Sequence, residues 1–566
     1  MKIIFGPTFF LRWVCLLVVA LSVEANAQID PGIDAQQSQL RQQRERADEI
    51  HAAAAAPDIR LKRQVETASD FPASESPCFP VKEIILDGVG SGRFQWALKA
   101  ANIARGRCLG TAGVNAVISR IQNALIGSGY VTTRVLAPTQ DLQSGKLVLL
   151  LVPGRVREIR AAEPVSGTRP VKTSFRRALP MRAGDVINLR DVEQGLENFK
   201  RLSSTDADIQ MVPGVEVGES DLIIALRQTR PWRMASSLDD GGSKSTGKYQ
   251  ANLTLVVDNP LALQDLFQVS VNSSIGGRTH GTRGHSAQYS VPYGYWLLAA
   301  SVNDYDYRQS VAGAIESYLY RGTSDNMELK LSRVFWRDAV RRLGFSLRAY
   351  QRNSRNFIDD TEVEIQRRRM GGFEVGLSGK QFFGSATIHA NISFKRGSGA
   401  FGRIAAPEEV AGEGTSRPRV INADFDLSLP LPVAGMQFDY QASWRAQWNR
   451  TALIAQDQFA IGGRYTVRGF DGESSLLSER GWLLRNDFTW TPQHSTQQFY
   501  LFIDHGEVGG RSSTTLAGTR LGGAGLGWRG QFKGMQYDLF AGRPIEKPIR
   551  FQTATVATGF NLGYLF

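Results

Sequence analysis

The sequence has little of the material from which metal centres and nucleophilic active sites are built. Its 566 residues include three cysteines and six histidines, and the histidines do not stand at the spacing of zinc ligands. It contains no GxSxG, no P-loop and no GxGxxG that follows a buried strand. The histidines are His51, His280, His285, His389, His494 and His505. We therefore predict no metal, no cofactor and no catalytic residues.

Long hydrophobic runs are also missing beyond the start of the chain. No later segment approaches the about 20 apolar residues that a transmembrane helix requires. The short apolar stretch WVCLLVVALSV follows Lys2 and Arg12 and precedes ANA at 25–27, which is the order of parts in a signal peptide. We expect 1–27 to be removed on export, so any membrane insertion must use strands.

Cysteine is rare enough for its pairing to be predicted by counting. Cleavage after Ala27 removes Cys15 and leaves Cys78 and Cys108. Two cysteines in an exported protein are more often bridged than free. We predict one disulfide between Cys78 and Cys108.

Positive charge is in excess, with a net charge of +12 and a pI near 9.6. Such a balance often indicates nucleic acid as a partner, but export argues against it. The arginines are spread among strand-like segments, where a polar lumen and contact with anionic lipid headgroups explain them better.

The first 230 residues divide into four parts. After the signal peptide, the polar, Gln-, Arg- and Ala-rich segment 28–56 favours one exposed helix, and 57–77 has the composition of a linker. Residues 78–154 and 155–230 each alternate strand-like and helix-like segments. We predict two α+β modules in tandem, each the size of a small domain.

From residue 231 to the end the pattern is that of strands. In MQFDYQASWRAQW, residues 436–448, apolar side chains occupy the even positions and polar ones the odd positions. Successive side chains of a strand leave opposite faces, so Asp439, Gln441 and Arg445 should face a wet lumen while the aromatic side chains face lipid. Strands in lipid must close into a barrel, and 231–566 has room for about sixteen of them.

Several passages resemble the two-partner secretion transporters, the outer-membrane components that export large haemolysins and adhesins. Residues 129–154 and 188–204 are similar to the family's two POTRA (polypeptide-transport-associated) domains, and 291–298 and 461–473 are similar to passages of its barrel. The resemblance implies an outer-membrane pore with periplasmic POTRA domains that bind an unfolded exoprotein, a large secreted partner. We expect outer-membrane lipid as a further partner and a monomeric protein.

The sharpest similarity is VRGF, which contains Arg468, Gly469 and Phe470. In the family this motif lies on a loop that folds into the barrel, here 461–475, and its arginine meets an aspartate of the wall. FIDHG supplies Asp504 and Gly506, and the alternation of its strand turns Asp504 inward. The pair implies a latch between loop and wall, and a static brace without a role in transport is the alternative.

Other interpretations remain open at this point. The segment 28–56 is either a plug in the pore, as the family implies, or a solvated leader. A general outer-membrane insertase shares the barrel and POTRA domains but usually has more of the latter. A passive porin or a barrel enzyme with Ser and His on separate strands leaves the periplasmic modules unexplained. The sequence does not name the exported client.

Overall fold

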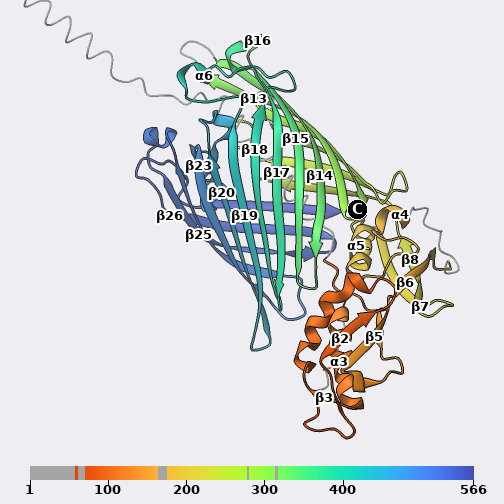
Figure 1. Ribbon diagram of the computed structural model, residues 1–566. Coiled ribbons are helices and arrows are strands. Elements are labelled where there is room, and N and C mark those ends of the chain that lie inside the picture. The colour runs from red at the N-terminus through yellow and green to blue at the C-terminus, as the bar shows by residue number, and fades with distance from the viewer. Residues whose placement is uncertain (1–57, 62–69, 164–174, 277–279, 313–316) are drawn as a thin grey trace, which may run out of the picture.

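The computed structural model describes residues 58–61, 70–163, 175–276, 280–312 and 317–566. Two small domains lie in line at one end of a large barrel, and the second of them touches the barrel rim (Figure 1). The predicted architecture of two α+β domains followed by an antiparallel barrel is confirmed. The predicted signal peptide (1–27) and helix (28–56), and part of the predicted linker (57–77), lie outside the described residues.

The first domain packs helices on a three-stranded sheet. β5 (Lys146–Val152) is central, parallel to β2 (Glu83–Asp87) and antiparallel to β4 (Arg134–Leu136). The leucines that alternate along β5 are buried against η1 (Ser91–Ala104) and α3 (Thr111–Gly127) in one apolar core. The remaining short elements are β1 (Phe79–Pro80), β3 (Cys108–Leu109) and η2 (Leu142–Ser144).

A disulfide joins Cys78 and Cys108 at one end of this domain. Beside it, the Glu75 carboxylate accepts hydrogen bonds of 2.7 and 3.0 Å from the backbone N–H groups of Gly110 and Gly113. These groups belong to the start of α3, where a negative charge is favourable. The chain that enters the domain is therefore fixed to the helix.

The second domain repeats this plan with β8 (Glu219–Gln228) between β6 (Arg155–Ala161) and β7 (Thr205–Pro213). α5 (Leu189–Lys200) starts where the Asn188 side chain accepts a hydrogen bond from the backbone of Arg190, a favourable N-cap. The four-residue α4 (Phe175–Ala178) packs beside it. Among the described residues, none of the helices is both long and apolar enough to cross a membrane.

Sixteen long strands form the closed barrel, each antiparallel to its neighbours. β27 pairs with β9 from Asn561↔Asp239 to Leu565↔Ala235 and so closes it. The strands are β9 (Trp232–Asp239), β10 (Gln250–Asp258), β11 (Leu266–Ser274), β12 (Gly281–Tyr293), β13 (Trp296–Ala312), β14 (Ser317–Arg337), β15 (Arg341–Ile358), β17 (Arg368–Phe383), β18 (Ala386–Ser398), β19 (Arg419–Val433), β20 (Met436–Asn449), β23 (Arg480–Thr491), β24 (Gln498–Gly509), β25 (Arg520–Phe532), β26 (Met535–Glu546) and β27 (Ala557–Leu565). Short elements in the connections are β16 (Thr361–Glu362), η3 (Glu364–Gln366), α6 (Glu408–Ala411) and η5 (Ser512–Thr515).

The two faces of the barrel wall differ in polarity. Apolar side chains such as Met327 and Leu347 are about half exposed on the outer face, at 57% and 46%. Between them on the inner face, Arg348 pairs with Glu328 at 3.1 Å and Glu374 at 2.5 Å. Because the closed sheet pairs the backbone of every strand, the apolar face is free to contact lipid.

Candidate functional site

A long loop between β20 and β23 turns back into the barrel. β21 (Phe459–Ile461) and β22 (Leu476–Ser478) pair as an antiparallel ribbon near its ends, and η4 (Ala455–Asp457) precedes them. The loop tip has no regular structure, yet Val467, Arg468 and Phe470 are at most 5% exposed. The tip is therefore enclosed by the barrel wall.

Arg468 at this tip makes a two-pronged contact with Asp504 on β24. Its Nε donates to Asp504 Oδ2 at 2.7 Å and its Nη2 donates to Oδ1 at 2.8 Å. The backbone N–H of Arg468 adds a third bond to Oδ2 at 3.0 Å. Asp504 is fully buried, and neighbouring Leu501 and Ile503 point outward, so the carboxylate points into the lumen. Such charge-assisted, bidentate bonds are strong and fix orientation.

Two further side chains complete the contact. Arg468 Nη2 donates to Asp487 Oδ1 on β23 at 2.6 Å, and the guanidinium carbon lies 4.2 Å from the centre of the Phe502 ring. Arg485 approaches Asp504 to 4.0 Å, so two cations face two carboxylates. Asp487 was not among the residues predicted from the sequence, although it alternates with Phe488 and Trp490 of β23, which are exposed on the outer face.

Glycines allow the tip to lie against β25 and β26. A Cβ added to Gly523 would stand 1.8 Å from the Arg468 carbonyl oxygen, and one added to Gly469 would stand 2.7 Å from the Arg543 carbonyl oxygen. Gly469 also has a φ of +96°, a conformation that favours glycine. Loop and wall therefore touch backbone to backbone, closer than any side chain permits.

The rest of the loop is fixed by contacts with other strands. Phe470 packs edge to face on Phe551 with ring centres 5.7 Å apart, within an apolar cluster that includes Val467. A Cβ on Gly506 would come within 2.9 Å of that valine. Arg464 donates to Asp240 Oδ1 at 3.1 Å. The two predicted glycines and the phenylalanine thus belong to the seat of the loop.

The structure places Asp439, Gln441 and Arg445 on one face of β20. The opposite face carries Met436 and Trp448, which are 41% and 42% exposed. Gln441 and Arg445 line an inner cavity, and Arg445 lies 3.4 Å from Asp424 on the neighbouring strand. These polar residues therefore lie on the lumen side of the wall.

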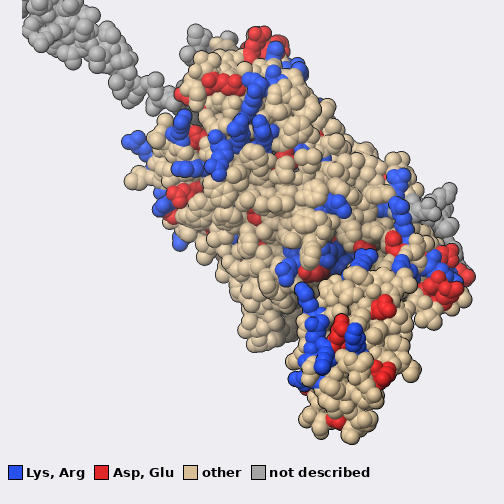
Figure 2. Space-filling view, viewed as in Figure 1, with Lys and Arg blue, Asp and Glu red and all other residues tan. Residues whose placement is uncertain are grey.

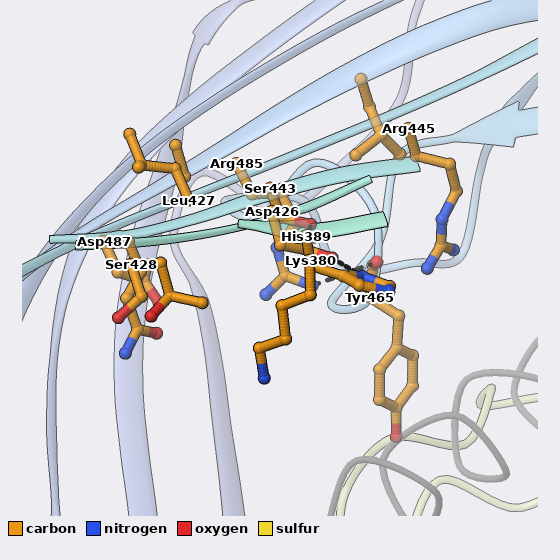
Figure 3. Close-up of a pocket in the computed structure, with 14 residues that line it drawn as sticks. Lys380, His389, Asp426, Leu427, Ser428, Ser443, Arg445, Tyr465, Arg485 and Asp487 are labelled. Carbon is orange, nitrogen blue, oxygen red and sulfur yellow. Dashed lines mark hydrogen bonds and ion pairs between the residues drawn. The ribbon is translucent and has the colours of Figure 1, made fainter. Parts of the chain in front are cut away.

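The inner cavity has a volume of about 310 Å³ and lies between the loop and the wall (Figure 3). Tyr465 enters it from the loop. Both signs of charge line it, and its charged residues are Lys380, Asp426, Arg445, Arg485 and Asp487. Among the described residues there is no cluster that could hold a metal ion.

The second small domain meets the barrel through α5. Arg337, the last residue of β14, donates to both oxygens of Glu197 at 2.8 Å, and its Nε lies 3.4 Å from Glu193. Arg342 adds a bond of 3.0 Å to Glu197. The three residues Arg337, Glu193 and Glu197 are at most 6% exposed at their side chains. No motif pointed to this contact in the sequence.

A short stretch of the predicted linker lies in the same junction. The backbone N–H groups of Ile59 and Leu61 donate to Glu197 at 3.1 Å and Glu193 at 3.0 Å. Arg337 donates to the Ile59 carbonyl at 2.9 Å, and Asp58 pairs with Lys380 at the barrel rim. Both carboxylates thus hold linker backbone as well as arginine.

A third contact joins the turn between β12 and β13 to α5. The Tyr295 hydroxyl donates to Asp191 at 2.5 Å, and the Asn198 side chain donates to the Gly294 carbonyl at 2.8 Å. Burial raises the pKa of the Asp191 carboxyl, and the hydrogen bond from Tyr295 opposes that shift. The junction is therefore a built interface with buried polar groups.

The comparisons with known proteins agree with this architecture. Residues 218–530 match the model of the haemolysin secretion/activation proteins ShlB/FhaC/HecB. Residues 79–154 match a ShlB-type POTRA domain and 155–213 match a second POTRA domain. The chain belongs to the ShlB/FhaC/HecB family. The family assignment identifies the two small domains as POTRA1 and POTRA2.

Similar proteins extend over nearly the whole chain. Outer membrane transporter CdiB-2 of Burkholderia pseudomallei (strain 1026b) is 34% identical over 94% of this chain and 93% of its own length. The hemolysin transporter protein ShlB of Serratia marcescens is 24% identical over 75% of each. The structure of CdiB from Acinetobacter baumannii superposes with a TM-score of 0.83 at 29% identity, covering 94% of this chain and 99% of that one.

As a member of this family the chain is an outer-membrane transporter of the two-partner secretion type. Its POTRA domains lie in the periplasm. The barrel rim beside POTRA2 is therefore the periplasmic rim, and the opposite strand ends face outward from the cell. The members of the family are transporters rather than enzymes.

Proposed function

We propose that this transporter moves one large exoprotein, of haemolysin, adhesin or contact-dependent toxin type, from the periplasm to the cell surface in an unfolded state. The observation that carries the proposal is the combination of two periplasmic POTRA domains with a barrel whose mixed-charge lumen is partly filled by a loop that Arg468 joins to Asp504 on the wall. The chain has no catalytic role in this proposal, and folding of the client outside the cell drives its movement. The signal peptide at 1–27 belongs to the same proposal.

The POTRA domains capture the client by main-chain pairing. Within the part of the chain that the structure describes, β7 of POTRA2 pairs with β8 alone, and its other edge is open for an extended segment to add as a strand. Such pairing tolerates many sequences, so side-chain contacts supply the choice of client. The alternating exposed residues on this edge strand are Asp206, Asp208, Gln210 and Val212.

The latch sets the closed state of the pore. In this proposal the client displaces the loop tip, which breaks the bonds between Arg468 and Asp504 and restores them when the client has left. Charge-assisted hydrogen bonds suit a reversible latch because water can replace them once the lumen is hydrated. The transporter works as a monomer, since one closed barrel holds the lumen and the loop together.

The test compares culture supernatants and outer membranes of cells with and without the protein. Loss of one large exoprotein from the medium, with other barrel proteins unchanged, is the expected result. A broad fall in outer-membrane barrel proteins would show an insertase instead. Unchanged fractions would overturn the proposal and direct attention to a passive pore.

A further inference from the structure

The outer wall of the barrel carries arginines at one end of four successive strands. Arg369 on β17, Arg396 on β18 and Arg419 on β19 are exposed, and Arg450 follows β20 directly. Each lies at the strand end away from POTRA2, which is the end that faces the cell exterior. Figure 2 shows Lys and Arg gathered on this part of the outer wall.

Alternation places these side chains on the lipid side of the wall. Arg396 has the same parity as Phe394, which is 40% exposed, whereas Lys395 between them is buried and bonds Asp457 at 2.8 Å inside the barrel. Arg450 has the parity of Trp448, which is 42% exposed. The arginines therefore continue the apolar outer face directly.

The strand register aligns three of them in a row. Arg396 stands opposite Arg419 across the β18–β19 ladder. Arg450 donates a backbone hydrogen bond of 2.8 Å to the Arg419 carbonyl and continues a register in which Val420 is opposite Asn449. Neighbouring strands are about 4.8 Å apart, so the row brings three guanidinium groups within reach of one ligand.

No carboxylate balances this row on its own surface. Along β17 to β20, all of them within the described residues, the outward positions contain no Asp or Glu and no charged residue besides the arginines. Among the described residues, none of the four arginines forms an ion pair. Like charges directly opposite each other destabilise a sheet. An anion from outside the protein would therefore stabilise the row.

Position decides what that anion is. The periplasmic ends of the outward faces of β17, β18, β19 and β20 carry no charged side chain and are apolar apart from Gln381, whereas the exterior ends carry the arginines. The two leaflets of an outer membrane also differ in charge at these two levels. The outer leaflet is built of glycolipid, which has phosphates at the boundary between its acyl chains and its sugars. Arginine binds phosphate through two parallel hydrogen bonds. Its guanidinium group is also more weakly hydrated than the ammonium group of lysine, so it loses water more easily on binding.

We propose that Arg396, Arg419 and Arg450, with Arg369 beside them, form a binding site for the phosphate groups of the outer-leaflet glycolipid, lipopolysaccharide. The acyl chains of the bound molecule lie on the apolar surface that includes Phe394 and Trp448. The site fixes the height and tilt of the β17–β20 wall in the membrane. It is separate from the lumen and from the loop latch.

The test uses the purified full-length protein in a neutral detergent, with lipopolysaccharide as the probe and native mass spectrometry as the readout. Wild type should retain lipopolysaccharide, and its dephosphorylated form should bind more weakly. The combined variant Arg396→Gln, Arg419→Gln and Arg450→Gln should raise the dissociation constant about tenfold or more. A barrel that keeps its heat-modifiable migration on gels shows that the variant is folded.

A matched control removes the same number of exposed arginines near the periplasmic rim, by Arg230→Gln, Arg333→Gln and Arg341→Gln, and should bind as wild type does. Should the combined variant fail to fold, Arg419→Lys replaces the centre of the row and keeps its charge, and it should still weaken binding. Equal binding by wild type and the row variants overturns the proposal. Equal displacement by inorganic phosphate or phosphatidylglycerol shows a nonspecific anion surface and overturns it as well.

Discussion

Arg337 and Glu197 stand 140 positions apart in the chain and form a bidentate ion pair in which both nitrogen–oxygen distances are 2.8 Å. Arg337 ends a barrel strand, and Glu197 lies on the POTRA2 helix. Because both side chains are nearly fully buried, this pair holds the domain to the rim in one orientation. The pair is one of several contacts that set the geometry of the periplasmic entrance, together with Tyr295–Asp191 and Arg342–Glu197.

Arg337→Ala should loosen POTRA2 from the barrel without unfolding the barrel. Removing one partner of a buried pair costs up to about 3–5 kcal/mol; here the cost is reduced because Arg190 still pairs with Glu193 and Arg342 with Glu197. We expect wider distance distributions between spin labels on POTRA2 and on the rim. Arg333→Ala, an exposed arginine of the same strand, is the control, and equal distributions in both variants would contradict the role of Arg337.

Arg468→Ala should reduce secretion while the barrel still assembles, because the loop loses its bonds to Asp504 and Asp487. Asp504→Ala should have the same effect, and the double variant should be little worse than either single variant, since both act on one contact. Secreted exoprotein in the medium is the measurement. Normal secretion by an assembled Arg468→Ala protein would make the contact a static brace.

Gly523→Ala should prevent the loop tip from seating while Arg468 and Asp504 remain intact. The added methyl group would stand 1.8 Å from the Arg468 carbonyl oxygen, so the loop must move away. Increased ion conductance in planar bilayers is the expected result. Gly563→Ala is the control, because its methyl group finds its nearest neighbour at 3.8 Å on another strand; equal conductance of the two variants would argue against the seat.

Replacing Cys78 and Cys108 together by serine should destabilise POTRA1 alone. The bridge closes a loop with a sequence separation of 30, for which chain entropy predicts a loss of about 3–4 kcal/mol. Pulse proteolysis in urea, applied to the full-length protein, should detect earlier cleavage within 78–154 and unchanged resistance of the barrel. Equal urea midpoints for POTRA1 in the variant and wild type would contradict this.

Asp191→Asn should make the POTRA2–barrel junction less sensitive to pH. Burial raises the pKa of Asp191 above its ordinary value of 3.8, so the folded state binds this proton more tightly than the unfolded state. Stability from this group is complete at pH values below the unfolded pKa and is lost as pH rises through the folded pKa. The asparagine side chain still accepts a hydrogen bond from Tyr295. The free energy of unfolding of POTRA2, measured as the pH rises above the ordinary aspartate pKa of 3.8, should therefore fall less in the variant than in wild type.

The sequence predicted those features that depend on one strand at a time. Alternation was enough to turn Asp504 inward and Trp448 outward, and the length of 231–566 was enough to predict about sixteen strands. Alternation did not predict the register between neighbouring strands. That register aligns Arg396 with Arg419, and with the fold of the loop it places Asp487 beside Arg468. The pair of Arg337 and Glu197 joins an ordinary helix to an ordinary strand end, so nothing local distinguished either residue.

POTRA2 is attached to the barrel at more than one place on the rim. The chain itself connects it to β9, and side chains connect it to the turn after β12 and to the end of β14. A force applied to POTRA2 is therefore transmitted to strands on both sides of β11. It acts as a torque on that part of the wall. Mechanical work done on the periplasmic domain reaches the barrel as a change of shape rather than as the peeling of its first strand.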